Sequence, residues 1–284
     1  MKIGLECIPC FLRQACEAVS MVTDEHTSRE RIIRQVLGRL ANESFEKTPP
    51  AVGADIHRIV RHLSGNSDPY REIKKESNAV ARELMPSLRE RISHCPDPFE
   101  TAVRLAIAGN IIDCGQGNHI SKQKIEQTIS RCLHHPLDTE RLNELREQIR
   151  KAAHILYLGD NAGEIFFDRL LLEHLEGAPI TFAVRGGPAI NDALTDDARS
   201  AGLFSLVTVI DNGTDVPGTI VKECSAEFQR HFARADLIIA KGQGNYETLS
   251  DEKKTIFFLL QAKCPAIVND IGCTQGDMVI ARNN

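Results

Sequence analysis

Residues 154–164 read HILYLGDNAGE, a short apolar run that ends in a polar, glycine-containing turn and leads into a helical pattern. Similar apolar runs follow at 180–184, 206–210, 236–240, 266–269 and 277–281. Helix-period segments at 164–176, 191–201, 219–234 and 251–262 separate most of these runs. This alternation predicts right-handed βαβ units and a mostly parallel, Rossmann-like sheet.

The half of the chain before residue 150 has a different pattern. Apolar residues recur at three- and four-residue spacing over 5–21, 27–43, 51–64, 68–93 and 98–110, and proline-rich breaks separate several of these segments. We therefore expect an α/β protein with two domains. A mainly α-helical domain would span 1–150, and a Rossmann-like α/β domain would span 151–284.

The composition restricts the class of protein. The 284 residues are 42% hydrophobic and 26% charged, as in ordinary folded proteins, and the net charge of −5 argues against a nucleic-acid partner. No apolar stretch is long enough for a membrane span, and the first residues lack the apolar region of a signal peptide. We expect a cytoplasmic protein without a membrane partner, and the oligomeric state is not indicated.

Polar residues follow the first two predicted strands. Asp160 and Asn161 come after the first, and Asn191 and Asp192 come shortly after the second. Such residues often cap the next helix. They are also hard oxygen ligands for Mg²⁺-type ions, beside helix N-termini that favour phosphate. Because strand ends of a parallel sheet converge on one edge, two such pairs favour a metal site.

The later strand ends add a turn and a cation. The sequence Asp211-Asn212-Gly213 favours a turn over a ligand pair. Lys241 opens the glycine-rich stretch KGQGNYE, where a point charge and backbone amides can approach an anion. No P-loop, dinucleotide fingerprint or nucleophile elbow follows a strand, which argues against nicotinamide and esterase enzymes.

The pair Cys7 and Cys10 has metal-ligand spacing, but it supplies only two of the four ligands of a structural zinc site. Three interpretations remain open: structural packing, a second metal, and redox pairing. Completion of a metal site would need distant thiols, for which the candidates are Cys16, Cys95, Cys114 and Cys273. Nine cysteines in a reducing compartment are expected to be reduced, buried or metal-bound.

Several motifs together resemble one family. In the α/β half they are GDNAGE (159–164), RGGPAINDA (185–193), IDNG (210–213) and KGQGNYETL (241–249). In the helical half they are CIPC (7–10), DPY (68–70) with Lys74 after it, and GNIID (109–113). In this order they resemble the damage-control phosphatase family, also called domain of unknown function 89. The N-terminal CxxC is similar to that of the microbial subfamily.

The resemblance implies a helical domain packed against a Rossmann-like domain. It also implies a metal-dependent phosphatase that hydrolyses small phosphate monoesters, such as sugar phosphates or damaged metabolites, with Mn²⁺, Ni²⁺, Co²⁺ or Mg²⁺. By motif position, the metal ligands would be Asp160, Asn161 and Asp192. Lys241 would contact the phosphate, and Asp160, Asp192 and Lys241 would form the catalytic set.

Other residues of the motifs are expected to contact the substrate, a small-molecule phosphate ester. Asn110 and Asp113 match the family's helical motif, and Asn191, Gly242 and Asn245 lie in the strand-end loops. Two alternatives stay open. One is an S-adenosylmethionine-dependent carboxyl methyltransferase, although the first βα turn lacks the usual glycine-rich loop. The other is a non-catalytic regulatory module that binds a metal or nucleotide.

Overall fold

The structure is a computed structural model, and it describes residues 1–111 and 122–283. The part before the sheet is helical, as the apolar spacing predicts. Its helices are α1 (Cys7–Val22), α2 (His26–Ala41), α3 (Pro49–Ser64), α4 (Arg71–Ser93), α5 (Pro98–Ile111), α6 (Lys122–His134) and α7 (Thr139–Lys151).

The remainder alternates strands and helices, as the sequence predicts. The strands are β1 (Ile155–Leu158), β2 (Ile180–Val184), β3 (Thr208–Asp211), β4 (Leu237–Lys241), β5 (Ile256–Gln261) and β6 (Met278–Arg282). The α-helices between them are α8 (Glu164–Leu172), α9 (Thr195–Ser200), α10 (Ala226–Arg234), α11 (Gly242–Leu249) and α12 (Pro265–Ile271). Short 3₁₀ turns lie at Leu203–Ser205 and Val221–Glu223.

Two assignments near the C-terminus were wrong. The helix expected over 251–262 contains strand β5, and the strand expected over 266–269 lies in helix α12. The first five residues of β5, IFFLL, are all apolar and buried because neighbouring layers cover both faces of the sheet, so they lack the alternation of a half-exposed strand. Pro265 at the first position of α12 is a common helix start.

The sheet is a Rossmann-like one, and its topology fixes where a ligand site lies. Its strand order is β3-β2-β1-β4-β5-β6, with every neighbouring pair parallel except β5 and β6. The winding direction reverses between β1 and β4, which opens a crevice beyond their carboxyl ends. Leu158 pairs with both Ala183 and Ala240, so β1, β2 and β4 end at the same level.

The hydrophobic cores group the helices differently from the sequence pattern. Helices α4 to α9 share one core with a face of the sheet, through residues such as Leu105, Phe167 and Phe182. Helices α1 to α3 enclose two smaller cores of their own, around Phe11 and Ile56 and around Val19 and Val60. Residue 150 therefore marks the start of the strands, but the packing does not divide there.

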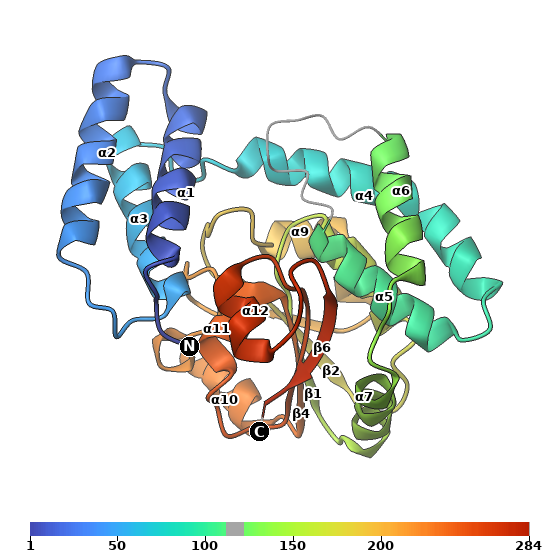
Figure 1. The fold of residues 1–284 in the computed structure, drawn as a ribbon. Helices are drawn as coiled ribbons and strands as arrows, with labels where there is room; N and C mark the ends of the chain where they lie inside the picture. Colours follow the sequence, from blue (N-terminus) through green and yellow to red (C-terminus); the bar gives the residue numbers. More distant parts are fainter. Residues whose placement is uncertain (112–121, 284) are drawn as a thin grey trace.

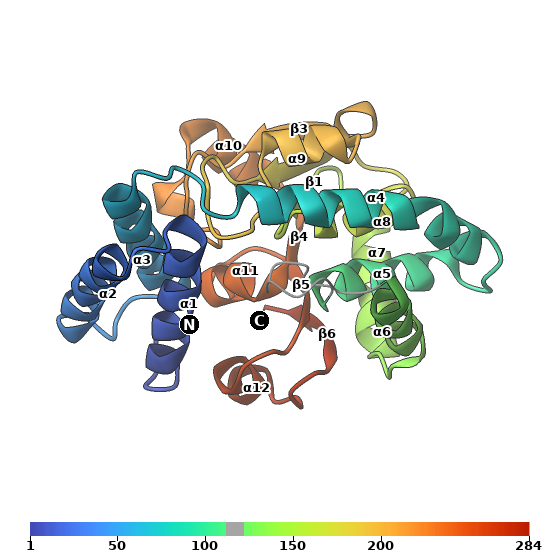
Figure 2. The same cartoon turned by 90° about the horizontal axis from the view of Figure 1, so that it is seen from above.

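Figure 1 shows the bundle of α1, α2 and α3 standing beside the α/β body, and Figure 2 shows α4 running from it across the molecule. Ion pairs connect the two parts: Arg58 and Arg61 of α3 both contact Asp215, in the loop after β3. Among the helices that the structure describes, none combines the length and hydrophobicity that a membrane span requires.

Candidate active site

Asp160 and Asn161 lie where β1 ends and the chain turns into α8. Oδ2 of Asp160 accepts hydrogen bonds from Nδ2 of Asn161 at 3.0 Å and from Nδ2 of Asn110, on α5, at 2.9 Å. Burial raises the pKa of the Asp160 carboxyl well above its usual value, and the nearby charges of Asp192 and Glu164 raise it further. The end of β1 therefore brings several acidic groups close together, which disfavours the ionised form of Asp160.

The loop after β2 brings Asp192 to the same place. Asn161 and Asp192 form an isolated antiparallel β-bridge, and the backbone nitrogen of Ala193 donates to the Asp160 carbonyl at 2.8 Å. Burial raises the pKa of Asp192, while its 2.6 Å hydrogen bond from Nε of Arg185 opposes that shift. The structure thus joins the two Asn/Asp pairs, as the convergence of strand ends predicts.

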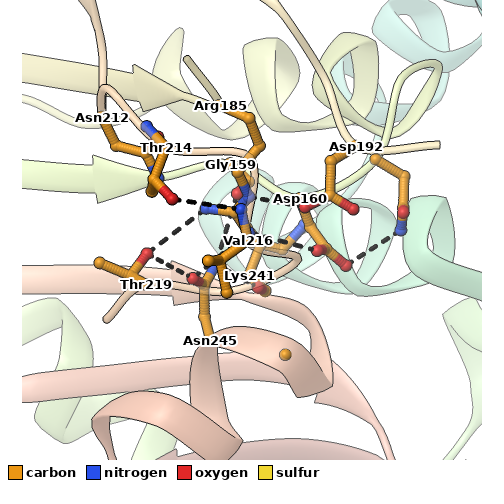
Figure 3. A network of polar contacts seen from close by, with 12 residues as sticks. Gly159, Asp160, Arg185, Asp192, Asn212, Thr214, Val216, Thr219, Lys241 and Asn245 are labelled. Carbon is orange, nitrogen blue, oxygen red and sulfur yellow. Dashed lines mark hydrogen bonds and ion pairs between the residues drawn. The ribbon is translucent and has the colours of Figure 1, made fainter. Parts of the chain in front are cut away.

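Arg185 lies beneath the site and connects the loop after β1, which carries Asp160, to the loop after β2, which carries Asp192. Figure 3 shows its guanidinium group among Asp160, Asp192, Thr219 and Asn245. Asn245 is completely buried, and its Nδ2 atom donates to the carbonyl of Lys241 at 2.8 Å. Asn245 was expected to contact the substrate, but its side chain supports Arg185 and does not line the pocket described below.

Lys241 also lies beneath the site. Its Nζ atom is within 2.8 Å of three acceptors, which are the carbonyl of Ala106 and the carboxylates of Glu164 and Asp168. Its side chain is 0% exposed. Burial lowers the pKa of Lys241, but the charges of Asp168 and Glu164 outweigh it and raise the pKa above its usual value. The expected contact between Lys241 and phosphate does not fit this geometry, because all of its donors face protein acceptors.

Glu164 and Asp168 lie one turn apart on α8 and complete the buried network. Burial raises the pKa of Glu164, but the charge of Lys241 and hydrogen bonds from Lys241, Asn110 and Asn161 bring it below its usual value. Burial raises the pKa of Asp168 to about 6, against the opposing charge of Lys241. Glu164 therefore stays ionised and holds both asparagine side chains.

A glycine is required at position 242 because the Asp160 carboxylate lies directly beside it. A Cβ atom added there would lie 1.9 Å from Oδ2 of Asp160, and the residue has a φ of +75°. The strand register explains this approach, since Asp160 and Gly242 each lie two residues beyond the paired Leu158 and Ala240. Gly242 was expected to contact the substrate; in the structure it leaves room for the Asp160 carboxylate.

A pocket of about 330 Å³ opens over these residues, between the sheet edge and the α1 to α3 bundle. This volume is in the range of sites for small molecules. Its floor includes Asn110, Asp160, Asn161, Asn191 and Asp192. The opposite wall comes largely from α1, with Cys7, Cys10, Phe11, Arg13, Gln14, Glu17 and Met21.

Lys263 provides a cation on the pocket side, which sequence reasoning missed. It lies two residues beyond the end of β5, is exposed, and its Nζ atom donates to the carbonyl of Asn110 at 2.7 Å. Its charge also partly opposes the rise in the pKa of Asp160 that burial causes. Because the sequence pattern predicted a helix over 251–262, the position of Lys263 at a strand end was not recognised. The apolar run IFFLLQ followed by AK is the signal that would have identified it.

Cys7 and Cys10 lie in the first turn of α1 and line the pocket wall. Burial raises the pKa of the Cys7 thiol, and the charges of Glu247 and Glu6 also raise it. Within residues 1–111 and 122–283, no group of three or more His, Cys, Asp or Glu side chains is placed to hold a metal ion. The described residues therefore offer no third thiol or carboxylate to complete a second metal site here, and Cys114 lies outside them.

The floor of the pocket has the side chains that a divalent ion would need. The buried network contains four carboxyl groups (Asp160, Glu164, Asp168 and Asp192) but only two basic groups, Arg185 and Lys241. Oδ1 of Asn110 is buried and has no hydrogen-bond partner among the residues that the structure describes. The carboxyl groups of Asp160 and Asp192, the amide side chains of Asn110 and Asn161, and this excess of acidic groups fit a hard divalent ion. Such an ion would use amide oxygens besides Asp160 and Asp192.

Of the other expected residues, Asn191 lines the pocket and Asp113 lies outside the described residues. Asp211 and Asn212 hold a turn, as expected. Oδ1 of Asp211 accepts from the backbone of Gly213, and Oδ1 of Asn212 accepts from Gly186 and Thr214.

The fold and the site define a Rossmann-like α/β protein with an acidic, oxygen-rich pocket at the switch point of its sheet. The family model "Damage-control phosphatase ARMT1-like domain" matches residues 3–279, and the chain belongs to this family. A damage-control phosphatase of Pyrococcus horikoshii is 38% identical, over 100% of this chain and 99% of that protein. One of Archaeoglobus fulgidus is also 38% identical, over 98% of each.

A solved structure supports the fold assignment. The crystal structure of a DUF89 family protein from Pyrococcus horikoshii superposes with a TM-score of 0.92 at 37% identity, and the match covers 100% of both chains. The family and these relatives support a phosphatase function for the chain.

Proposed function

We propose that the chain is a metal-dependent phosphatase that hydrolyses small phosphate monoesters, such as sugar phosphates or damaged phosphometabolites. The observation that carries the proposal is the pairing of Asp160 and Asp192 with Lys263 around one pocket of about 330 Å³. Asp160, Asn161 and Asp192 would hold the ion, and Oδ1 of Asn110, which has no partner in the described part of the chain, is a further oxygen beside it. When bound, a divalent ion supplies Lewis-acid chemistry and offsets negative charge on the phosphoryl group.

The residues around the ion would position the substrate. Lys263 is the cation on the pocket side closest in sequence to a strand end, and we assign it the phosphate contact in place of Lys241. An ammonium group there would stabilise the non-bridging oxygens, because phosphoryl transfer depends mainly on positioning and electrostatics. Lys241 would act indirectly: it keeps Glu164 ionised, and Glu164 fixes the Asn161 and Asn110 amides.

The substrate's organic part would meet the α1 wall. That wall presents the polar side chains of Arg13, Gln14 and Glu17 beside Phe11 and Met21, a mixture suited to a polyhydroxylated molecule with a carbon skeleton. The pocket volume is at the small end of the usual range for ligand sites. Both features support a small phosphate ester over a macromolecular substrate.

The test is phosphate release from a panel of phosphosugars, phosphopantetheine-like esters and nucleoside phosphates. Chelator-treated protein should be inactive, and Mn²⁺, Co²⁺, Ni²⁺ or Mg²⁺ should restore turnover. Asp160→Asn should lose metal and turnover, whereas Asp211→Asn, an exposed strand-end residue outside the pocket, should match the wild type. Full activity after complete metal removal would contradict the proposal. Binding of S-adenosylmethionine without phosphate release would favour the methyltransferase alternative.

A further inference from the structure

Ile190 has an unusual backbone conformation next to the proposed metal site. Its φ is +50°, and it is the one non-glycine residue with positive φ within the described part of the chain. This conformation is strained for L-residues and most strained for β-branched ones. Strained residues persist only where surrounding structure holds them, and they concentrate at functional sites.

The strain belongs to the turn that presents Asp192. The backbone nitrogen of Asp192 donates to the carbonyl of Ala189 at 2.9 Å, which places Ile190 at the second position of a four-residue turn. Positive φ at this position is normally supplied by Gly, Asn or Asp. The carbonyl of Asn191 accepts from the backbone of Ala162 at 2.9 Å, so the turn is joined to the loop that carries Asp160 and Asn161.

The side chain of Ile190 shows what holds the turn. It packs against the core formed by Val19 of α1, Val60 of α3 and Tyr70, within the helical bundle. Arg61, the neighbour of Val60 on α3, donates through Nη1 to the carbonyl of Pro188 at 2.7 Å. Helix α3 thus contacts the loop by a hydrogen bond and by an apolar anchor two residues further on.

We propose that Ile190 is a positioning residue that couples the helical bundle to the metal ligand Asp192. Its anchored side chain maintains the strained turn, and the turn directs the Asp192 carboxylate toward Asp160 and Asn161. The inference rests on the proposed function, because it requires Asp192 to bind the ion. It extends that function by giving α3 and Tyr70 a role in metal affinity, although they provide no ligand.

The experiment measures the Mn²⁺ dissociation constant by equilibrium dialysis without substrate, together with thermal stability. Ile190→Gly removes the anchor while allowing the positive φ, and we expect the dissociation constant to rise about tenfold, as for other residues that orient ligands. Val60→Ala truncates a member of the cluster against which Ile190 packs, without altering the loop, and should also raise the constant. Ile190→Val, which retains most of the apolar contact, should stay close to the wild type.

A matched control separates positioning from general stability. Val36→Ala truncates a residue in the other core of the bundle, away from Ile190. It should lower the melting temperature while leaving the dissociation constant unchanged. Wild-type Mn²⁺ affinity in both Ile190→Gly and Val60→Ala, with affinity lost in Asp192→Asn, would overturn the role of Ile190 and leave the proposed function standing. Wild-type affinity in Asp192→Asn would overturn both.

Discussion

Nζ of Lys241 lies 2.7 Å from Oε1 of Glu164, and Oε2 of the same carboxylate lies 2.9 Å from Nδ2 of Asn161. The lysine is therefore linked to the pocket floor through a carboxylate and does not enter the pocket. Removal of such a lysine should affect folding first, because it leaves buried charge unpaired. Removal of a cation on the pocket side should instead weaken ligand binding first.

This difference gives a paired prediction for Lys241 and Lys263. Lys241→Met leaves Glu164 and Asp168 buried without their cation and should lower the free energy of unfolding by about 3–5 kcal/mol. Lys263→Met, at an exposed position, should change it by less than about 0.5 kcal/mol. Urea denaturation measures both values. Lys263→Met should instead raise the inhibition constant of inorganic phosphate, and an unchanged constant would remove Lys263 from the phosphate site.

Gly242→Ala should displace the Asp160 carboxylate, because the added methyl group would lie 1.9 Å from its Oδ2 atom. We expect the Mn²⁺ dissociation constant to rise tenfold or more, on the order seen when ligand orientation is lost. Gly272→Ala is the matched control, with a φ of +77° and nothing within 4 Å of the new atom. It should carry the same backbone strain, about 1–2 kcal/mol, with unchanged metal affinity. Equal affinities in the two variants would contradict the steric argument.

Glu247, on the pocket side of α11, should make stability depend on pH. Burial raises its pKa to about 8, and the N-terminal ammonium group only partly offsets this. Because the folded-state pKa lies above the unfolded value, its contribution to stability is full below about pH 4.5 and is lost as pH rises toward 8.

The variant Glu247→Gln tests this dependence. Relative to wild type, it should gain about 1 kcal/mol or more of unfolding free energy at pH 8 and little at pH 4.5. Urea titrations at the two pH values measure the difference. Glu83→Gln, at an exposed position on α4, should show no such change with pH. A parallel shift of Glu247→Gln at both pH values would show that packing, and not titration, causes the effect.

The pocket thiols should be dispensable for catalysis. Burial keeps the pKa of Cys7 above its usual value, so Cys7 is a neutral thiol and a poor nucleophile at pH 7. The Cys7→Ser, Cys10→Ser double variant should keep the wild-type Mn²⁺ dissociation constant and kcat, with any change confined to KM and stability. Dialysis and steady-state assays check this. A folded, metal-loaded double variant without turnover would place the thiols in the chemistry.

The sequence predicted strands β1 to β4 and β6, and it brought the two Asn/Asp pairs to one edge of the sheet. Apolar runs followed by Asp160-Asn161 and by Asn191-Asp192 identified strand ends, and strand ends of a parallel sheet must meet. The meeting of these strand ends depends only on the parallel direction of the strands, and not on the side chains that follow them. The same reasoning placed Lys241 at the correct edge of the sheet, but it could not show that the side chain points down into the core.

What sequence reasoning missed depends on burial. Strand β5 is covered on both faces, so its apolar run has no alternation that distinguishes it from a helix, and Lys263 was overlooked with it. Glu164 and Asp168 left a readable signal, as two acids four residues apart in the otherwise mainly apolar helix EIFFDRLLL. Their partner came from β4, more than 70 residues away, and only the folded chain identifies it.

The α1 to α3 bundle, with its own cores, carries most of the wall that faces the pocket floor. Under the proposed function, bond cleavage would take place at the end of the sheet, and substrate choice would depend on the separately packed bundle. Substitutions in the bundle away from the cluster around Ile190 would then leave the Asp160 and Asp192 carboxylates in place. Under that proposal, a change of bundle residues would change the substrate without changing the reaction, provided that the contact between Ile190 and the bundle core is kept.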